Sequence, residues 1–530
     1  MSKLLPIPLF TQENLPEEFI PYAKYNQQAE DFEQIKNFAF NDVPFEYTEY
    51  GNSLRFKEIT KGIFVFISTL DKYALYKDGR WQLDEDQAIY RAWDWLLQTL
   101  KDEVDFYNML LKQLKKFDEE EFSIKPLEKR LLVRIKEVTA HYKTCQRKAT
   151  IKASLELFST RKGVTVPLST FDSKPYFVGA KNGIIDLRTG DFITNKPEYL
   201  MMKSLAVSYD PEKNCPKFKQ FIAEVMLSNL DVIAFMKRLA GQMILGITNK
   251  DKFVILIGEG LNGKSVFIDI LISLLGDYAE QTDADVFTEK RSNKDYFKAE
   301  LVGKRLVAMN ESNRGDKLDS SMVKSCVRSG KIVARSPHMK PITYQPMFTP
   351  VLSTNNLPYI EQDKAVWERL LIIPFDYVVP KDKRDSELKE NLIKEEAQGI
   401  LNWMIEGAQD FLVQGLNIPD VIVQKQAEYR LKSDRVSQFL SDSCGEPISI
   451  KESLPLRAKF NQILSGYKIW CNLNNYLPLG SGALKDELKK KGLKVGKDSD
   501  GDFSVSQVAI IDFGDTISLK LHENTVTQVM

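Results

Sequence analysis

The sequence predicts an α/β protein built around a parallel sheet with flanking helices, with an α+β region before it and a tail of helices and strands after it. Three observations lead to this prediction. An apolar run at 252–257 continues through a glycine-rich loop into a stretch of helical spacing that ends at Gly276. Two later apolar runs, 305–309 and 350–354, are typical of strands and end in polar residues. The composition then changes after residue 440.

Composition narrows the class of protein. The chain has 530 residues, of which 43% are hydrophobic and 28% charged, and this length predicts roughly two to four domains. No apolar run reaches the ~18 residues of a membrane span, and the first residues lack the layout of a signal peptide. The five cysteines are scattered, which favours neither a disulfide framework nor a zinc site and fits a reducing cytoplasm, such as that of a bacterial host cell. The net charge of +0 argues against a protein that coats nucleic acid through bulk charge, but not against a ring with basic residues in its channel.

The first 140 residues predict an α+β region of unknown role. Ser53 to Trp81 reads as β-rich, with apolar alternation and a Lys-Asp-Gly turn, and residues 85–140 switch to helical spacing. Residues 141–163 are rich in Lys and Arg, which indicates either a solvated helix face or a surface that meets DNA phosphates. Residues 171–216 contain Asn-Gly and Thr-Gly pairs between short apolar runs, a pattern typical of a small β-meander, and helices are expected from 217 to 248.

The glycine-rich loop fits the pattern G-x-x-x-x-G-K-[ST] between a strand and a helix, the context that a phosphate-binding loop requires. Glycines let successive N–H groups turn toward the phosphates of a nucleotide, and the following helix points its positive end at the same anion. Lys264 places a charge on the β/γ oxygens, and the Ser265 hydroxyl can ligate Mg²⁺. The alternative is a chance glycine turn. The predicted ATP-binding residues are Gly258, Glu259, Gly260, Leu261, Asn262, Gly263, Lys264, Ser265 and Val266.

Three later positions have residue types that suit phosphoryl transfer. Glu311 follows the strand at 305–309, where a carboxylate can activate water and organise Mg²⁺ through its waters; an exposed acid is the alternative. Asn355 follows the next strand, where an amide can hold the attacking water, although Asn is also common in turns. Arg369 precedes a final strand and could reach a nucleotide held by a neighbouring subunit, or simply pair with Glu368 or Asp363.

A basic block lies between the second and third of these strands. Residues 324–340 carry Lys, Arg and His without an acid, and Pro337 to Pro341 reads as a hairpin tip. Such a tip could grip the backbone of single-stranded DNA in a channel, or be an ordinary surface hairpin. The predicted DNA-binding residues are Lys331, Arg335, His338 and Lys340.

Taken in order, these motifs resemble the superfamily 3 helicases, a branch of the AAA+ ATPases, and in particular the poxvirus-type primase-helicases with their phage and plasmid relatives. The resemblance rests on GEGLNGKS, VAMNE, the block ending in PVLSTN, the D-x-x-x-W-x-R-L-x-x-I-P-F segment, and the NGIIDLRTG stretch upstream. It implies ATP and Mg²⁺ at Lys264 and Ser265, Glu311 as catalytic acid, Asn355 as sensor and Arg369 as a finger acting in trans. The sequence departs from the family at Glu368, where an arginine is common, and at Lys331, where an acid is common.

The tail from residue 441 contains helix-like stretches at 454–476 and 482–492 followed by alternating segments, a pattern that suggests a winged helix. A single helix at 418–440 should connect it to the motor. Lysines at 485–494 could face DNA or be a solvated helix surface. The expected domains are 1–140, a pre-motor segment at 141–222, the AAA+ motor at 223–417, and the linker helix with the winged-helix-like tail at 418–530.

Two classes of function remain open from the sequence. The first is an ATP-dependent ring helicase, usually hexameric and 3′ to 5′ in this family, that unwinds single-stranded and forked DNA during replication of a phage, plasmid or other mobile element. The second is a nucleotide-regulated initiator or scaffold that binds DNA without unwinding it. The first 140 residues are short for a primase and show no convincing arrangement of paired carboxylates with a histidine, so we expect no primer synthesis by this chain. A separate primase or loader is a candidate partner. Because no apolar run is long enough to span a membrane, no membrane partner is expected.

Overall fold

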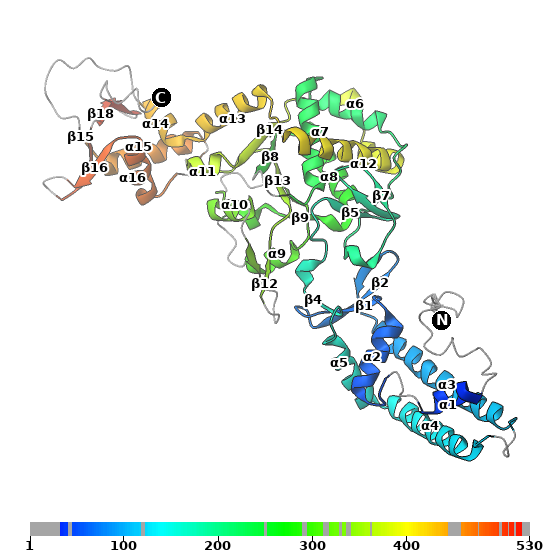
Figure 1. Cartoon of the computed structure of the whole chain (residues 1–530). Coiled ribbons are helices and arrows are strands. Elements are labelled where there is room, and N and C mark those ends of the chain that lie inside the picture. The colour runs from blue at the N-terminus through cyan, green and yellow to red at the C-terminus, as the bar shows by residue number, and fades with distance from the viewer. Residues whose placement is uncertain are drawn as a thin grey trace. The chain divides into compact units, whose positions relative to one another are not determined.

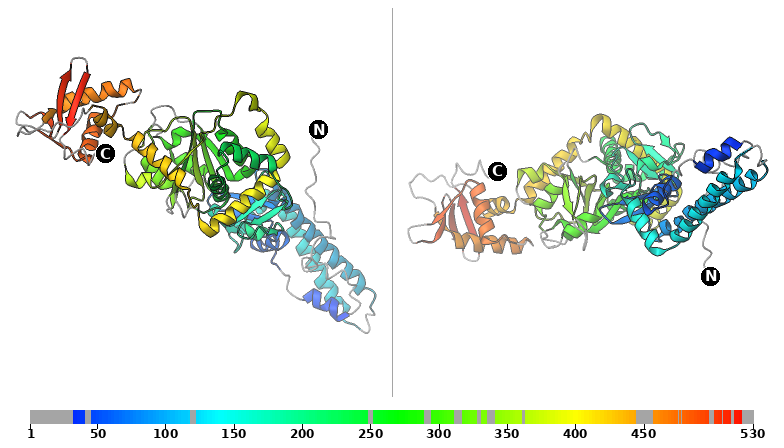
Figure 2. Two further views of the ribbon diagram at one scale, coloured as in Figure 1. Left: turned by 90° about the horizontal axis from the view of Figure 1, so that it is seen from above. Right: turned by 60° about the horizontal axis from the view of Figure 1, so that its bottom comes forward.

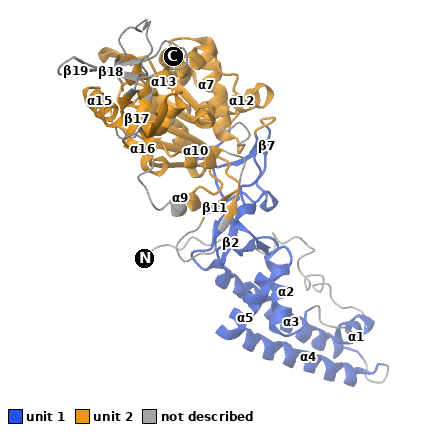
Figure 3. Ribbon diagram, turned by 90° about the vertical axis from the view of Figure 1, so that its left-hand side faces the viewer, with its two compact units in different colours: residues 1–186, 191–209, 335–342 blue, residues 187–190, 210–334, 343–530 orange. Residues whose placement is uncertain are grey.

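The computed structural model (Figure 1) describes most of the chain in ranges separated by gaps. By contacts the chain divides into two compact units (Figure 3): unit 1 takes in 1–186, 191–209 and 335–342, and unit 2 takes in 187–190, 210–334 and 343–530. The described residues are 32–40, 45–117, 122–247, 252–288, 294–310, 317–327, 331–334, 341–360, 363–443, 457–474, 476, 478–497, 501–506, 508–513 and 516–521.

Unit 1 combines helices with two small sheets, in agreement with the α+β region predicted at the start of the chain. Strands β1 to β3 form an antiparallel meander, and β4 pairs in parallel with β1. A second antiparallel meander, β5-β6-β7, turns at Asn182-Gly183 and Thr189-Gly190 as predicted. The helices are α1 (Phe32–Phe40), α2 (Glu49–Thr60), α3 (Ala88–Leu114), α4 (Ile124–Cys145) and α5 (Lys148–Ser159), and the strands are β1 (Phe64–Ile67), β2 (Lys72–Lys77), β3 (Arg80–Leu83), β4 (Thr165–Val166), β5 (Phe177–Ala180), β6 (Gly183–Asp186) and β7 (Phe192–Ile193).

The predicted β-rich stretch was wrong in its first part, because residues 53–60 belong to helix α2. The Thr48 hydroxyl caps this helix by accepting a hydrogen bond from the Gly51 N–H at 3.0 Å. The buried face of α2 is largely polar, with Asn52 and Arg55 beside Phe56. Because apolar residues do not recur at helical spacing, the periodicity that indicates a helix is missing from this segment.

Unit 2 is centred on a five-stranded, fully parallel sheet in the order β14-β8-β13-β10-β9. Successive strands are in register, so that Leu256 pairs with Ser353 and Ser353 with Asn310. The carboxyl ends of all five strands therefore meet at one edge, where open parallel sheets bind ligands. The strands are β8 (Phe253–Ile257), β9 (Ala279–Asp283), β10 (Leu306–Asn310), β13 (Thr349–Thr354) and β14 (Leu370–Pro374).

Helices flank this sheet. Alternate residues of β8 (Phe253, Ile255 and Ile257) join one apolar core with residues of α9, α10 and α11. Helix α8 contacts β9 and β10, and α12 packs on α8 and runs beside α7 (Figure 2). A Cβ at Gly407 would lie 2.0 Å from the Lys237 carbonyl oxygen, so glycine permits this close approach. The helices are α6 (Pro216–Val225), α7 (Leu230–Ile244), α8 (Lys264–Leu275), α9 (Lys294–Glu300), α10 (Ser320–Val327), α11 (Lys364–Trp367) and α12 (Leu388–Gln414).

The remaining elements are a short two-stranded sheet and the tail. Strands β11 (Ile332–Ala334) and β12 (Ile342–Tyr344) pair with one another. The tail contains an antiparallel sheet in the order β15-β17-β16 with α15 and α16 between its first two strands in the chain, followed by a β18-β19 hairpin. Its elements are α13 (Asp420–Ser433), α14 (Arg435–Ser443), β15 (Arg457–Lys459), α15 (Phe460–Leu473), α16 (Ser481–Lys490), β16 (Lys494–Lys497), β17 (Phe503–Ser506), β18 (Val508–Phe513) and β19 (Thr516–Leu521).

Several predicted boundaries fall elsewhere in the structure. The single connecting helix predicted at 418–440 was wrong, because Asp434 separates α13 from α14 and its carboxylate accepts from the Ser437 N–H at 3.1 Å, which caps the new helix. The expected domain limits at 140 and 222 lie inside α4 and α6, whereas the limit at 417 lies in the connection between α12 and α13. Among the described helices, none is both long enough and apolar enough to cross a membrane.

Candidate functional site

The loop between β8 and α8 takes backbone conformations that glycine favours. Gly260 has φ +103°, and Gly263, which precedes the first residue of α8, has φ +85°. Gly258 is required for a different reason: a Cβ there would lie 2.0 Å from Asn262 Nδ2 and 2.6 Å from the Phe375 carbonyl oxygen. The glycines of the motif therefore follow from the backbone angles and the space available, and they keep the loop closed against the end of the sheet.

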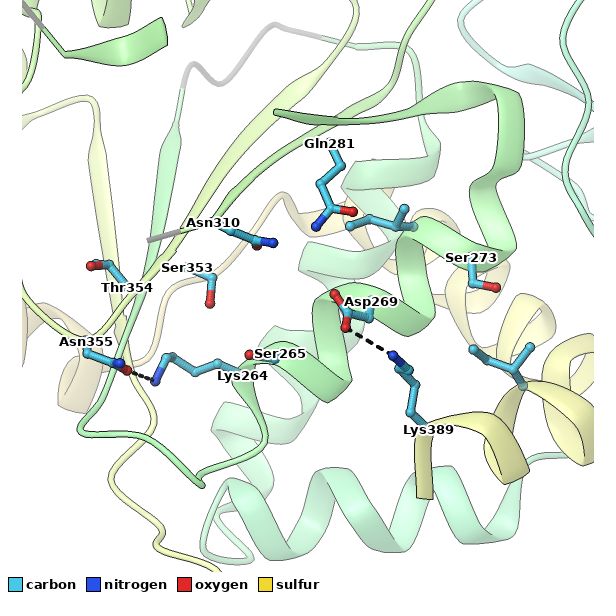
Figure 4. A pocket seen from close by; sticks show the side chains of 12 residues that line it. Lys264, Ser265, Asp269, Ser273, Gln281, Asn310, Ser353, Thr354, Asn355 and Lys389 are labelled. Atoms are coloured by element: carbon cyan, nitrogen blue, oxygen red, sulfur yellow. Dashed lines mark hydrogen bonds and ion pairs between the residues drawn. The ribbon is translucent and has the colours of Figure 1, made fainter. Parts of the chain in front are cut away.

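Lys264 is held at the inner side of this loop with its side chain almost completely buried. Its ammonium donates to the Gly258 carbonyl oxygen at 2.7 Å and to Asn262 Oδ1 at 3.0 Å. A third contact, 3.1 Å to Asn355 Oδ1, reaches the residue that follows β13 (Figure 4). Asn262 donates in turn to the Phe375 carbonyl oxygen at 3.0 Å. The cation is thus positioned between the loop and the neighbouring strand, the placement that electrostatic stabilisation of a phosphate needs.

The loop is also supported from outside its own sequence. The Phe375 N–H donates to the Ile257 carbonyl oxygen at 2.8 Å, and the Val379 N–H donates to the Leu261 carbonyl oxygen at 2.9 Å. On the other side, a Cβ at Gly263 would lie 2.7 Å from Val225 Cγ1 of α6. The segment after β14 and helix α6 therefore hold the loop in place.

A cleft of about 690 Å³ lies beside the start of α8, at the carboxyl ends of β10 and β13 (Figure 4). Ser265 and Asn355 both line it, on either side of Lys264. Asn310, the last residue of β10, lies on the same edge because it pairs in register with Ser353. The full lining is Lys264, Ser265, Asp269, Ile272, Ser273, Gln281, Asn310, Ser353, Thr354, Asn355, Lys389 and Ile393.

The structure brings some of the predicted site residues together. Lys264, Ser265 and Asn355 share the cleft, whereas Glu259 and Leu261 are exposed at the top of the loop. Glu311, which follows Asn310 in the sequence, lies outside the described residues, as do Arg335, His338 and Lys340. Lys331 is described and exposed, immediately before β11.

Arg369 does not line this cleft. Its carbonyl oxygen accepts from the Phe253 N–H at 2.8 Å, so it marks the amino end of β8 and β14. A five-residue strand at ~3.3 Å per residue separates that end from the loop by about 16 Å. The sequence also allowed an ion pair between Arg369 and Asp363. The Asp363 carboxylate instead contacts the Lys324 ammonium, and this contact lowers the pKa of Asp363. The Arg369 guanidinium donates to the Ala365 carbonyl oxygen instead.

Two charged residues of the cleft were not predicted from the sequence. Asp269 comes from α8 and Lys389 from the first turn of α12, and their carboxylate oxygen and ammonium lie 3.5 Å apart. Proximity to Asp269 raises the pKa of Lys389. Asp269 could have been found, because it lies four residues after Ser265 and thus on the same face of the helix. Lys389 had no such signal, since it is more than a hundred residues from the loop in the sequence.

Two family models match the chain. The one described as "D5 N terminal like" matches residues 47–227, and the one described as "Family of unknown function (DUF5906)" matches residues 256–369. The first match begins just before α2 and ends just after α6. The second begins at the end of β8 and ends at Arg369, so it contains the loop and the strands that form the cleft.

Curated viral proteins are similar over parts of the chain. "Putative helicase L207/L206" of Acanthamoeba polyphaga mimivirus is 25% identical over 57% of this chain and 34% of its own length. "Putative helicase V13" of Sputnik virophage is 26% identical over 39% and 29%, and "Putative primase C962R" of African swine fever virus is 20% identical over 68% and 40%. The chain thus spans 29 to 40% of the length of these relatives. A solved structure, the apo NrS-1 C terminal region, aligns over 86% of this chain and 99% of its own at 12% identity, with a TM-score of 0.43.

Proposed function

Because the chain is a D5-like relative of the superfamily 3 primase-helicases, we propose that it is an ATP-driven DNA helicase that serves replication of a phage, plasmid or other mobile element. The observation that carries this proposal is the meeting of Lys264, Ser265 and Asn355 in one cleft at the carboxyl edge of a parallel sheet. The relatives named helicase and primase support an activity on DNA.

The donor set of the cleft fits a magnesium-bound nucleoside triphosphate. The loop is closed so tightly that a Cβ at Gly258 would collide with it, and its N–H groups and the start of α8 favour an anion. Lys264 would contact the β- and γ-phosphates and the Ser265 hydroxyl would ligate Mg²⁺, which supplies charge neutralisation during phosphoryl transfer. Asn355 would orient the attacking water beside Lys264. The proposed role of the Glu311 carboxylate is to accept a proton from that water.

The position of Arg369 supports an assembly in which each site is completed by a neighbour. An arginine about 16 Å from its own loop is too far to reach the nucleotide held by the same subunit. A second copy could present it to the γ-phosphate, where such a finger stabilises developing charge. We therefore propose an AAA+ ring of identical subunits, a hexamer, with Arg369 acting in trans.

DNA contact is proposed at two places. In the sequence, β11 and β12 lie between β10, which ends in Asn310, and β13, which Asn355 follows, and the exposed Lys331 immediately precedes β11. This order supports a hairpin that contacts single-stranded DNA. The proposed direction, 3′ to 5′, comes from the resemblance to the family. The tail has the element order helix, strand, helix, helix, strand, strand from α14 to β17, which supports a winged helix. A separate primase or loader would act with the motor.

The first experiment is ATP hydrolysis by the full chain with and without single-stranded DNA, with Lys264→Ala as the blank, followed by strand separation on tailed duplexes. Stimulation by DNA that disappears in the blank, together with unwinding, is the expected result. Hydrolysis indifferent to DNA and absent in the blank would instead favour a nucleotide-regulated initiator or scaffold.

The role of Arg369 is tested by mixing two inactive variants. Lys264→Ala and Arg369→Ala should each be inactive alone, but their mixture forms interfaces that join an intact Lys264 to an intact Arg369. Recovery of part of the wild-type turnover in the mixture is expected, and its complete absence would contradict a finger in trans.

A further inference from the structure

The ion pair between Lys389 and Asp269 has no role in the function proposed above. It joins α12 to α8 across the cleft, and the two side chains point toward one another (Figure 4). The exposed fractions of the two side chains are 36% and 31%. Ion pairs with this exposure contribute little to the stability of the fold. Stability alone therefore does not explain why two opposite charges line the cleft.

The location of Lys389 at the start of its helix also favours a negatively charged partner. It is the second residue of α12, a helix of 27 residues, and a cation in the first turn is disfavoured by the helix dipole. The negative charge of Asp269 offsets this unfavourable effect. The Glu390 carboxylate, 3.4 Å from the Lys389 ammonium, offsets it further. An anion that entered the cleft could offset it equally well.

Asp269 lies close to the position expected for the nucleotide. It follows Ser265 by four residues on α8, so the two side chains occupy the same helix face with Cβ atoms about 6 Å apart. The metal that Ser265 would ligate, with the terminal phosphate beside it, is therefore expected within about one helical turn of the Asp269 carboxylate. The ammonium of a lysine stands on a flexible four-carbon chain, so Lys389 can turn from Asp269 toward that position.

We propose that Lys389 is a second phosphate-binding residue of the cleft, which exchanges Asp269 for the terminal phosphate when a nucleoside triphosphate binds. This inference rests on the proposed nucleotide site. A diphosphate lacks the terminal group and would leave Lys389 on Asp269. The contact of Lys389 with phosphate would thus be specific for the triphosphate. As a result, α12 would make different contacts in the triphosphate-bound and diphosphate-bound states.

Helix α12 is connected to the loop by a second route. Its buried Glu396 carboxylate accepts from the Lys217 N–H at 3.0 Å and from the Phe218 N–H at 2.8 Å, and so caps the start of α6. The far end of α6 contacts Gly263 through Val225. A change at Lys389 could therefore reach the phosphate-binding loop through α6 as well as through α8.

The test measures binding, without turnover. Dissociation constants of the full chain are determined with Mg²⁺ for ADP and for a non-hydrolysable ATP analogue, by displacement of a fluorescent nucleotide. Lys389→Ala should weaken the ATP analogue about 10-fold and change ADP by less than about 2-fold. Asp269→Asn, which removes the competitor for Lys389, should bind the ATP analogue as tightly as the wild type or about 2- to 5-fold more tightly. Lys394→Ala, an exposed lysine of the same helix, is the matched control and should change neither constant.

The different effects expected for the two variants distinguish a phosphate contact from a structural ion pair. If Asp269→Asn and Lys389→Ala weaken ADP and the ATP analogue equally, the pair only holds α8 to α12 and the inference is wrong. An unchanged ratio of the two constants in Lys389→Ala would also overturn it. If the wild type binds neither nucleotide, the proposed function fails and this inference fails with it. Thermal unfolding of the nucleotide-free variants shows that each remains folded.

Discussion

Two clusters of polar side chains, one in each unit, differ in their access to a cavity, and this difference decides what they can do. The cleft cluster (Asn262, Lys264 and Asn355) borders a cavity of about 690 Å³, with Asn262 and Lys264 buried and Asn355 exposed. The closed cluster in unit 1 lies inside the helices of that unit, and its members are at most 7% exposed. The closed cluster consists of Asn52, Arg55, Glu103, His141 and Cys145.

The closed cluster contains residue types that elsewhere perform nucleophilic catalysis. His141 Nε2 lies 2.7 Å from Asn52 Oδ1 and 3.2 Å from Cys145 Sγ. Burial, however, raises the pKa of Cys145 to about 11 and lowers that of His141 to about 4, so the thiol stays protonated and the imidazole neutral at pH 7. The same types of side chain are therefore structural where solvent is excluded, and access to a cavity is what separates the cleft cluster from them.

The charged pair of the closed cluster completes the contrast. Arg55 and Glu103 lie 3.4 Å apart, and Glu103 also accepts from the Tyr47 hydroxyl at 2.6 Å. Both members of the pair are almost completely buried, so each requires the other. The comparison predicts that substitutions in the cleft cluster remove activity and preserve the fold, whereas substitutions in the closed cluster do the reverse.

The largest expected effect is that of Lys264→Ala on turnover. Removal of the buried ammonium should reduce ATP hydrolysis by a factor on the order of 10³ or more. The free energy of unfolding of the nucleotide-free chain should hardly change, because the hydrogen bonds of this ammonium are made beside the cleft, where water can replace it. Parallel measurements of hydrolysis and urea unfolding check this prediction, and a variant that is active or unfolded would break the comparison at its first member.

Glu103→Ala should show the opposite pattern. It leaves the buried Arg55 guanidinium without its carboxylate and should lower the free energy of unfolding by about 3 to 5 kcal/mol. Nucleotide affinity, measured well below the unfolding temperature, should stay within about 2-fold of the wild type. Glu128→Ala, which removes a partly exposed carboxylate 3.9 Å from Lys115, is the control and should cost less than about 1 kcal/mol. A large decrease of nucleotide binding in Glu103→Ala would contradict the separation of the two roles.

The same contrast explains which features the sequence could predict. The loop was predictable because its strand, glycines, lysine and helix are contiguous, so that the pattern itself contains the geometry. Asn355 was predictable from its position at a strand end. Lys389 was not, since only the packing of α12 on α8 brings it to the cleft. The closed cluster could not be predicted either, because its members come from three helices and have no common spacing. Its polar residues also interrupt the apolar periodicity of α2, so the helix itself was not recognised.

The smallest expected effect, and the finest test of the comparison, is the response of the closed cluster to acid. Burial, followed by the Arg55 charge, lowers the pKa of His141 from 6.5 to about 4, so the folded protein disfavours the imidazolium. Its contribution to stability is complete above pH 6.5 and is lost as the pH falls from 6.5 toward 4, because unfolding then takes up a proton. Between pH 7 and pH 5 this should lower the free energy of unfolding by roughly 1 to 2 kcal/mol. Urea unfolding at both pH values measures the change, and His141→Gln should lose this part of the pH dependence. An identical pH dependence in that variant would mean that other groups carry it, and that the closed cluster does not depend on a neutral imidazole.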